Sequence, residues 1–105
     1  MTESPRLQQI REWLSDSPDD PELHYALAME LRSAGNDDAA VSELAKLIRA
    51  RPDFVPSYLM QAQLLTKQVR DNEARIVLSD GIAAARKAGN DHALIELQAL
   101  LDSLS

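Results

Sequence analysis

A period of 34 residues runs through this chain and constrains its fold more than any local motif does. Shifted by 34 positions, Ile10 falls on Leu44, and Leu44 falls on Leu78. Small residues also fall on small residues, as Ala28 does on Ala62. Since large and small positions both keep their places, the chain builds one structural unit more than once and stacks the copies.

The hydrophobic spacing within each period identifies the unit as helical. Apolar residues recur at intervals of three and four, which places them on one face of an α-helix, and no stretch keeps the alternation expected of a strand. Because the connections are short, neighbouring helices are expected to be antiparallel. The sequence therefore predicts an all-α fold of antiparallel helix–turn–helix repeats, an α-solenoid of about six helices. These helices are expected over residues 5–16, 21–34, 37–50, 56–68, 71–88 and 91–105.

Residues at the helix ends support these boundaries. Ser4 and Asp20 are expected N-caps, and each is followed by a proline at the first helical position. Gly35 is expected to end the second helix in a left-handed conformation, because it has no Cβ. A second Gly-Asn-Asp turn at 89–91 repeats the one at 35–37. The last helix is expected to bury one face, made of Leu94, Leu97, Leu101 and Leu104.

Residues 21–54 carry the pattern of a known family, since they resemble a tetratricopeptide repeat, a helix–turn–helix unit of 34 residues. The pattern positions are taken by His24, Leu27, Ala28, Leu31, Gly35, Ala40, Leu44 and Pro52. Residues 55–88 resemble a second, degenerate unit. In this unit Val69 replaces the turn glycine and Arg86 replaces the closing proline.

The resemblance also covers the two ends of the chain. Residues 1–18 look like the second half of a preceding unit, and residues 91–105 look like the capping helix that covers the last apolar face of such arrays. The resemblance thus implies a single domain over residues 1–105. Departures from the family pattern affect the spacing of the helices: His24 stands where tryptophan is usual, and Leu47 stands where alanine is usual. Ala28 and Ala62 stand where glycine is commoner.

The resemblance implies a binding surface, a concave groove lined mainly by the first helix of each hairpin. Its positions in this chain are Tyr25, Met29, Arg32, Ser33, Leu59, Gln63, Thr66 and Lys67. Tyr25 and Met29 supply adaptable apolar surface. Arg32 and Lys67 stand at the same end of their helices, where they are expected to receive a carboxylate of the partner.

The function implied by the resemblance is that of a non-catalytic adaptor that binds another protein or a peptide segment in this groove. Stacked hairpins hold a rigid curved surface, so a partner binds without first ordering the scaffold. The alternative is a homo-oligomeric structural module that pairs through its terminal helices or through the groove, because two units bury little apolar area alone.

Residue types that carry chemistry are scarce, so no enzyme activity, cofactor or metal is expected. The chain has no cysteine and only three isolated glycines, which excludes thiol nucleophiles and a glycine-rich phosphate loop. His24 and His92 lie two periods apart, and each imidazole is expected to fill the place of an aromatic residue rather than to bind a metal. The acidic residues at 16–22 are interpreted as a solvated turn with helix caps, since they lack the loop of a calcium site.

Trp13, the only tryptophan, is expected to pack in the core against the second helix.

Charge and hydropathy limit the partners and the compartment. The net charge is −6, and residues 1–45 hold three basic and ten acidic groups. Such a chain repels phosphate backbones, so no nucleic-acid partner is expected, although Arg49, Arg51, Arg70, Arg75, Arg86 and Lys87 give some local basic character. No apolar run approaches the length that crosses a bilayer, so no membrane partner is expected. A cytoplasmic location is the resulting expectation.

Overall fold

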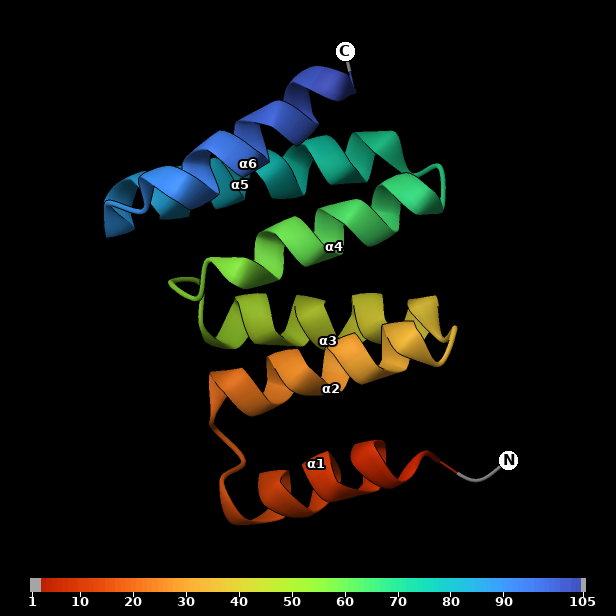
Figure 1. Cartoon of the computed structure of the whole chain (residues 1–105). Helices are drawn as coiled ribbons and strands as arrows, with labels where there is room; N and C mark the ends of the chain where they lie inside the picture. The colour runs from red at the N-terminus through yellow and green to blue at the C-terminus, as the bar shows by residue number, and fades with distance from the viewer. Residues whose placement is uncertain (1–2, 105) are drawn as a thin grey trace.

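A computed structural model describes residues 3–104, and within that range it contains six α-helices and no strand. Residues 1, 2 and 105, which the sequence analysis assigns to the leading and capping segments, lie outside the described range. The helices are α1 (Pro5–Asp16), α2 (Pro21–Ser33), α3 (Asp37–Ala50), α4 (Pro56–Lys67), α5 (Asp71–Ala88) and α6 (Asp91–Ser103). They stack antiparallel in chain order, so α1 and α6 lie at opposite ends of the stack (Figure 1). The predicted all-α helical repeat is therefore confirmed.

The N-caps predicted from the sequence are present. The Ser4 hydroxyl accepts a hydrogen bond from the backbone N–H of Leu7 at 3.1 Å, and the Asp20 carboxylate accepts one from Glu22 at 2.9 Å. Each bond satisfies a backbone donor that the first turn of a helix leaves unpaired. The predicted helix ends agree with the structure to within one residue, except that α6 ends at Ser103, two residues before the predicted end.

The three turns that close α2, α4 and α5 have the same backbone conformation. Gly35, Val69 and Gly89 all have positive φ, at 79°, 59° and 67°. In each turn the next residue donates its N–H to the carbonyl five positions earlier, for example Asn36 to Leu31 at 2.9 Å. This is the usual way in which a left-handed residue ends a helix. Val69 adopts this conformation although a β-branched side chain disfavours it.

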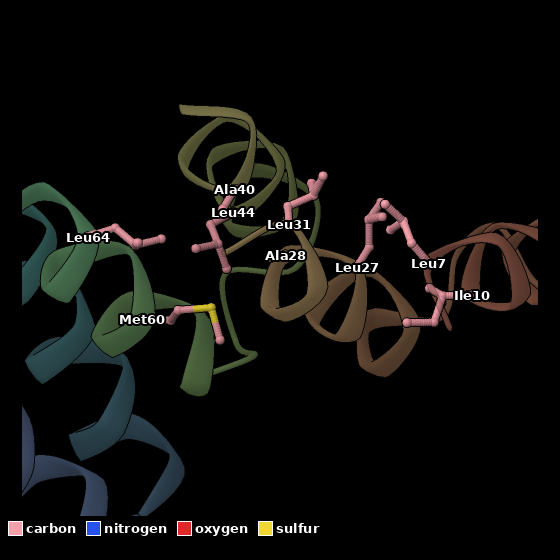
Figure 2. Packing of buried hydrophobic residues seen from close by; sticks show 9 residues of the cluster. All are labelled: Leu7, Ile10, Leu27, Ala28, Leu31, Ala40, Leu44, Met60 and Leu64. Atoms are coloured by element: carbon pink, nitrogen blue, oxygen red, sulfur yellow. The ribbon is translucent and has the colours of Figure 1, made fainter. Parts of the chain in front are cut away.

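Two clusters of buried side chains hold the stack together. The first joins α1, α2, α3 and α4 through Leu7, Ile10, Leu27, Ala28, Leu31, Ala40, Leu44, Met60 and Leu64 (Figure 2). In it, Leu7 and Ile10 of α1 lie beside Leu27 of α2 (Figure 2). Ala28 and Ala40 of this cluster have no exposed surface.

The second cluster joins α4, α5 and α6 around Leu97, which is fully buried. Leu94, Leu101 and Leu104 pack against it from the same face of α6. The predicted apolar face of the last helix is therefore confirmed.

An aromatic side chain in the first helix of each complete hairpin is bonded to the preceding turn. The Tyr58 hydroxyl donates to the carbonyl of Pro52 at 2.6 Å, and His24 Nε2 lies 2.5 Å from the carbonyl of Pro18. Because a carbonyl only accepts, His24 must carry its proton on Nε2. His24 thus occupies the place of the aromatic residue, as predicted.

The prediction that His92 fills the same place is wrong, since 89% of its side chain is exposed. It pairs instead with Glu96 on its own helix, at 2.7 Å. In the second hairpin this place is closed by α5, where an added Cβ on Gly81 would lie 2.6 Å from Tyr58 Cβ. No described helix stands in the corresponding position next to His92.

The prediction that Trp13 packs in the core is also wrong, because half of its surface, 50%, is exposed. The period aligns Trp13 with Leu47 and Gly81 in the second helices of the complete hairpins. That position faces the first helix of its own hairpin, as the contact between Gly81 and Tyr58 shows. None of the described residues forms such a helix next to α1, so Trp13 faces solvent.

Candidate functional groove

A concave groove of about 410 Å³ crosses the first helices of the hairpins. Its walls come from α2, α4 and the beginning of α6, which all turn one face to the same side of the stack. The lining residues are Tyr25, Met29, Arg32, Val55, Pro56, Leu59, Met60, Gln63, Asn90, His92, Ala93, Glu96 and Leu97. The groove is therefore a property of the repeat, since equivalent helix faces are brought side by side by the stacking.

Five of the eight residues predicted for the groove line it, namely Tyr25, Met29, Arg32, Leu59 and Gln63. The other three lie outside its lining. Thr66 donates its hydroxyl hydrogen bond to the carbonyl of Ala62, on its own helix, at 2.9 Å. Lys67 forms an ion pair with Asp37 of α3, with 3.0 Å between Nζ and Oδ2. Ser33 is exposed at the last turn of α2. The groove thus keeps one of the two cations that the sequence assigned to it.

The floor of the groove is apolar and partly exposed. Met29 has 40% of its surface exposed, and Leu59 is half-buried beside it on the neighbouring helix. The Tyr25 ring packs edge-on against Phe54, with 5.8 Å between ring centroids and 61° between planes. That contact fixes the ring at one end of the floor.

Opposite charges stand on opposite walls of the groove. Arg32 comes from α2 and Glu96 from α6. Burial raises the pKa of Tyr25 above its usual value; the nearby positive charge of Arg32 opposes this rise, and the negative charge of Glu96 adds to it. No carboxylate of residues 3–104 lies within ion-pair distance of Arg32, so its guanidinium keeps its hydrogen-bond donors for other groups.

The wall supplied by α6 was missed from the sequence. By the period, Ala93 and Leu97 align with the groove positions Leu59 and Gln63. In the structure Leu97 is fully buried against the floor, and His92 and Glu96 form the rim instead. The available signal was Glu96 itself, because it stands where the complete units have a buried alanine and a carboxylate cannot be buried there without a partner.

Among the residues that the structure describes, no group of three or more His, Cys, Asp or Glu side chains could hold a metal ion. In the same part of the chain, no helix is both long enough and apolar enough to cross a membrane.

Comparisons with known proteins agree with this architecture. The family model described as "Tetratricopeptide repeat" matches residues 1–55, which is half of the chain. A crystal structure of a tetratricopeptide repeat domain protein from Salinibacter ruber is 30% identical and has a TM-score of 0.77, with 81% of this chain and 94% of that chain covered. A solution structure of a tetratricopeptide repeat domain protein from the same organism is 31% identical and has a TM-score of 0.80, with 84% and 89% covered.

A third solved structure, the solution structure of a protein from Bordetella parapertussis, is 23% identical and has a TM-score of 0.81, over 96% of this chain and 88% of that chain. This likeness supports the fold alone. The comparison with curated proteins finds no match.

The chain belongs to the tetratricopeptide repeat family. Members of this family are in general non-catalytic scaffolds for interactions between proteins.

Proposed function

We propose that this chain is a non-catalytic adaptor that binds a short apolar segment of another protein in the groove of α2, α4 and α6. The observation that carries the proposal is the apolar floor at Met29 and Leu59, next to the guanidinium of Arg32, which has no carboxylate of residues 3–104 within ion-pair distance. The flexible thioether of Met29 adapts to varied apolar partners, so this floor suits an apolar ligand segment.

Arg32 defines the charge of the preferred segment. A partner carboxylate could approach it without displacing an existing ion pair. A charge-assisted hydrogen bond at the edge of an apolar floor orients the ligand as well as binding it. We therefore expect a segment with one acidic side chain close to two or three apolar ones.

The scaffold supports binding by being already ordered. Of the three helices that line the groove, α2 packs in the first buried cluster, α6 packs in the second and α4 packs in both, so their positions are fixed before a ligand arrives. Binding then loses little conformational entropy in the scaffold. The volume of about 410 Å³ accommodates only a few side chains, which favours a short segment over a whole domain.

The test is a selection of peptides from a display library with the full chain, followed by affinity measurements with three variants. Met29→Glu is expected to weaken the selected peptides at least about tenfold, which corresponds to about 1.4 kcal/mol, because it places a charge on the apolar floor. Arg32→Glu is expected to weaken acidic peptides more than neutral ones.

Ile76→Glu is the matched control, since Ile76 is 65% exposed on α5 and does not line the groove. This variant should bind the peptides as the wild-type chain does. Circular dichroism checks that all three variants keep their helices. Equal binding by folded Met29→Glu, or no enriched peptide at all, contradicts the proposal.

A further inference from the structure

Two walls of opposite charge face each other across the groove of α2, α4 and α6. Of the described residues that line it, Arg32 on α2 and Glu96 on α6 carry the permanent charges, and only His92 among the others can also become charged at ordinary pH. No ion pair joins Arg32 to Glu96. The groove therefore keeps a cation and an anion apart, one on each wall.

The packing of α6 fixes the place of Glu96 at the groove. Leu97 is fully buried in the second cluster, and successive residues of an α-helix are turned by about 100° from each other. Glu96, one position earlier, therefore stands on the flank of the helix, where it lines the groove. Its side chain is 46% exposed, so a ligand in the groove can reach the carboxylate.

Tyr25 stands within the electrostatic range of both walls. Burial raises the pKa of Tyr25, and the charges of Arg32 and Glu96 then change it in opposite directions. The ring is held in place by its edge-on contact with Phe54. A short segment that covers the Tyr25 ring can therefore reach the cation on one wall and the anion on the other.

The carboxylate of Glu96 has a weak partner within the chain. Among residues 3–104, the only basic side chain within ion-pair distance is His92, one turn away on the same helix at 2.7 Å. The side chain of His92 is 89% exposed, and an exposed pair of this kind contributes little free energy. The pair therefore leaves Glu96 available to a stronger cation.

A ligand that covers Glu96 removes water from its carboxylate, and this loss costs free energy unless a hydrogen-bond donor or a cation replaces the water. A basic side chain of the ligand supplies that replacement. A purely acidic segment does not, and Glu96 also repels it. The net charge of −6 disfavours such a segment further.

We propose that the groove selects short segments in which an acidic and a basic side chain flank apolar residues, with the acid bound by Arg32 and the base bound by Glu96. Glu96 is then the residue that determines specificity for the base. The proposal rests on the groove function proposed above and deepens it, because Arg32 and the apolar floor alone would accept acidic segments that carry no base.

The experiment is a selection of peptides from a display library against the full chain, Glu96→Gln and Asp102→Asn, at physiological ionic strength. Asp102→Asn is the matched control, because Asp102 is exposed on the same helix, loses the same charge and does not line the groove. Peptides selected by the wild-type chain and by Asp102→Asn should combine acidic and basic residues within a few positions. Peptides selected by Glu96→Gln should keep the acidic residues and lose the excess of basic ones.

The tightest wild-type peptide then gives a quantitative measurement. A version with glutamine in place of its basic residue should bind the wild-type chain at least about fivefold more weakly than the original peptide does. The same two peptides should bind Glu96→Gln within about twofold of each other, because the partner of the base is gone. Circular dichroism checks that this variant keeps its helices, as expected for a change at an exposed position.

The outcomes separate this proposal from the groove function. Selected peptides that lose binding to Met29→Glu but carry no excess of basic residues leave the groove function intact and overturn the role of Glu96. An excess of basic residues that Glu96→Gln retains also overturns it, since the net charge of the chain would then be the cause. Equal losses by the wild-type chain and Glu96→Gln in the quantitative measurement have the same meaning. No selected peptide at all, or equal binding by folded Met29→Glu, overturns both proposals.

Discussion

The two complete hairpins, α2–α3 and α4–α5, share one backbone arrangement. They differ in the residue of the second helix that faces the first helix, which is large in one hairpin and small in the other. In the first hairpin, His24 and Leu47 line the same corner. In the second hairpin, Tyr58 packs against Gly81 so closely that a Cβ atom on residue 81 would not fit. The comparison teaches that the repeat constrains the combined size of a facing pair rather than either residue alone.

The two hairpins also differ at the turn between their helices. Gly35 and Val69 occupy equivalent positions with left-handed backbones, at φ of 79° and 59°. Glycine adopts this conformation freely, whereas valine adopts it at a cost of about 1–2 kcal/mol. The surrounding helices therefore stabilise the second turn against its own local preference.

Leu47→Ala should have the largest effect on this comparison. Leu47 is buried, and shortening it leaves a cavity between α3 and the first helix of its hairpin. The free energy of unfolding should fall by about 2–5 kcal/mol in a urea titration. Lys46→Ala, at the exposed neighbouring position, is the control and should change it little. A loss as small as that of the control would contradict the packing described for the first hairpin.

Gly81→Ala should have the next largest effect, and in the same direction although the residue becomes larger. The new methyl group would lie 2.6 Å from Tyr58 Cβ and 3.2 Å from Leu97 Cδ2, so α4, α5 and α6 must move apart. We expect a loss of about 1–3 kcal/mol in the free energy of unfolding, in spite of the higher helix propensity of alanine. Ser79→Ala, at an exposed position of α5, supplies the matched control. If Gly81→Ala proved more stable than the wild type, the close contact would be disproved.

Val69→Gly should have the smallest effect and the opposite sign. It removes the left-handed strain of an exposed valine, whose side chain is 84% exposed and contributes little packing. We expect a gain of about 1 kcal/mol, measured by thermal and urea unfolding. The reverse change in the first hairpin, Gly35→Val, should destabilise by a similar amount. Equal stabilities for both pairs would show that the two turns do not differ as described.

Much of the fold was predictable because the period and the helix ends act locally. The caps Ser4 and Asp20 and the glycine turns depend on neighbouring backbone atoms, so their residue types alone indicate them. The apolar face of α6 was predictable as well, since a stripe of leucines has only one side to bury. Five of the eight positions that the family resemblance implies for the groove line it.

Two of the errors concern residues whose burial depends on a neighbouring helix that the described residues do not contain. Trp13 and His92 have the sequence positions of core residues, yet the helix that would cover each of them is not among the described ones. The position of Lys67 depends on Asp37, a partner distant in the sequence that only the folded stack brings within 3.0 Å. Periodicity predicts which positions are equivalent, but burial depends on what stands opposite.

The central claim is that the groove of α2, α4 and α6 is the surface that receives a partner. Its most direct test is a nuclear magnetic resonance titration of the labelled chain with the tightest peptide from the selection. The account predicts that the largest shifts fall on Tyr25, Met29, Leu59 and Gln63, with little change at Val69. Shifts concentrated on the outward faces of α1 and α6, with the groove residues unchanged, would contradict it.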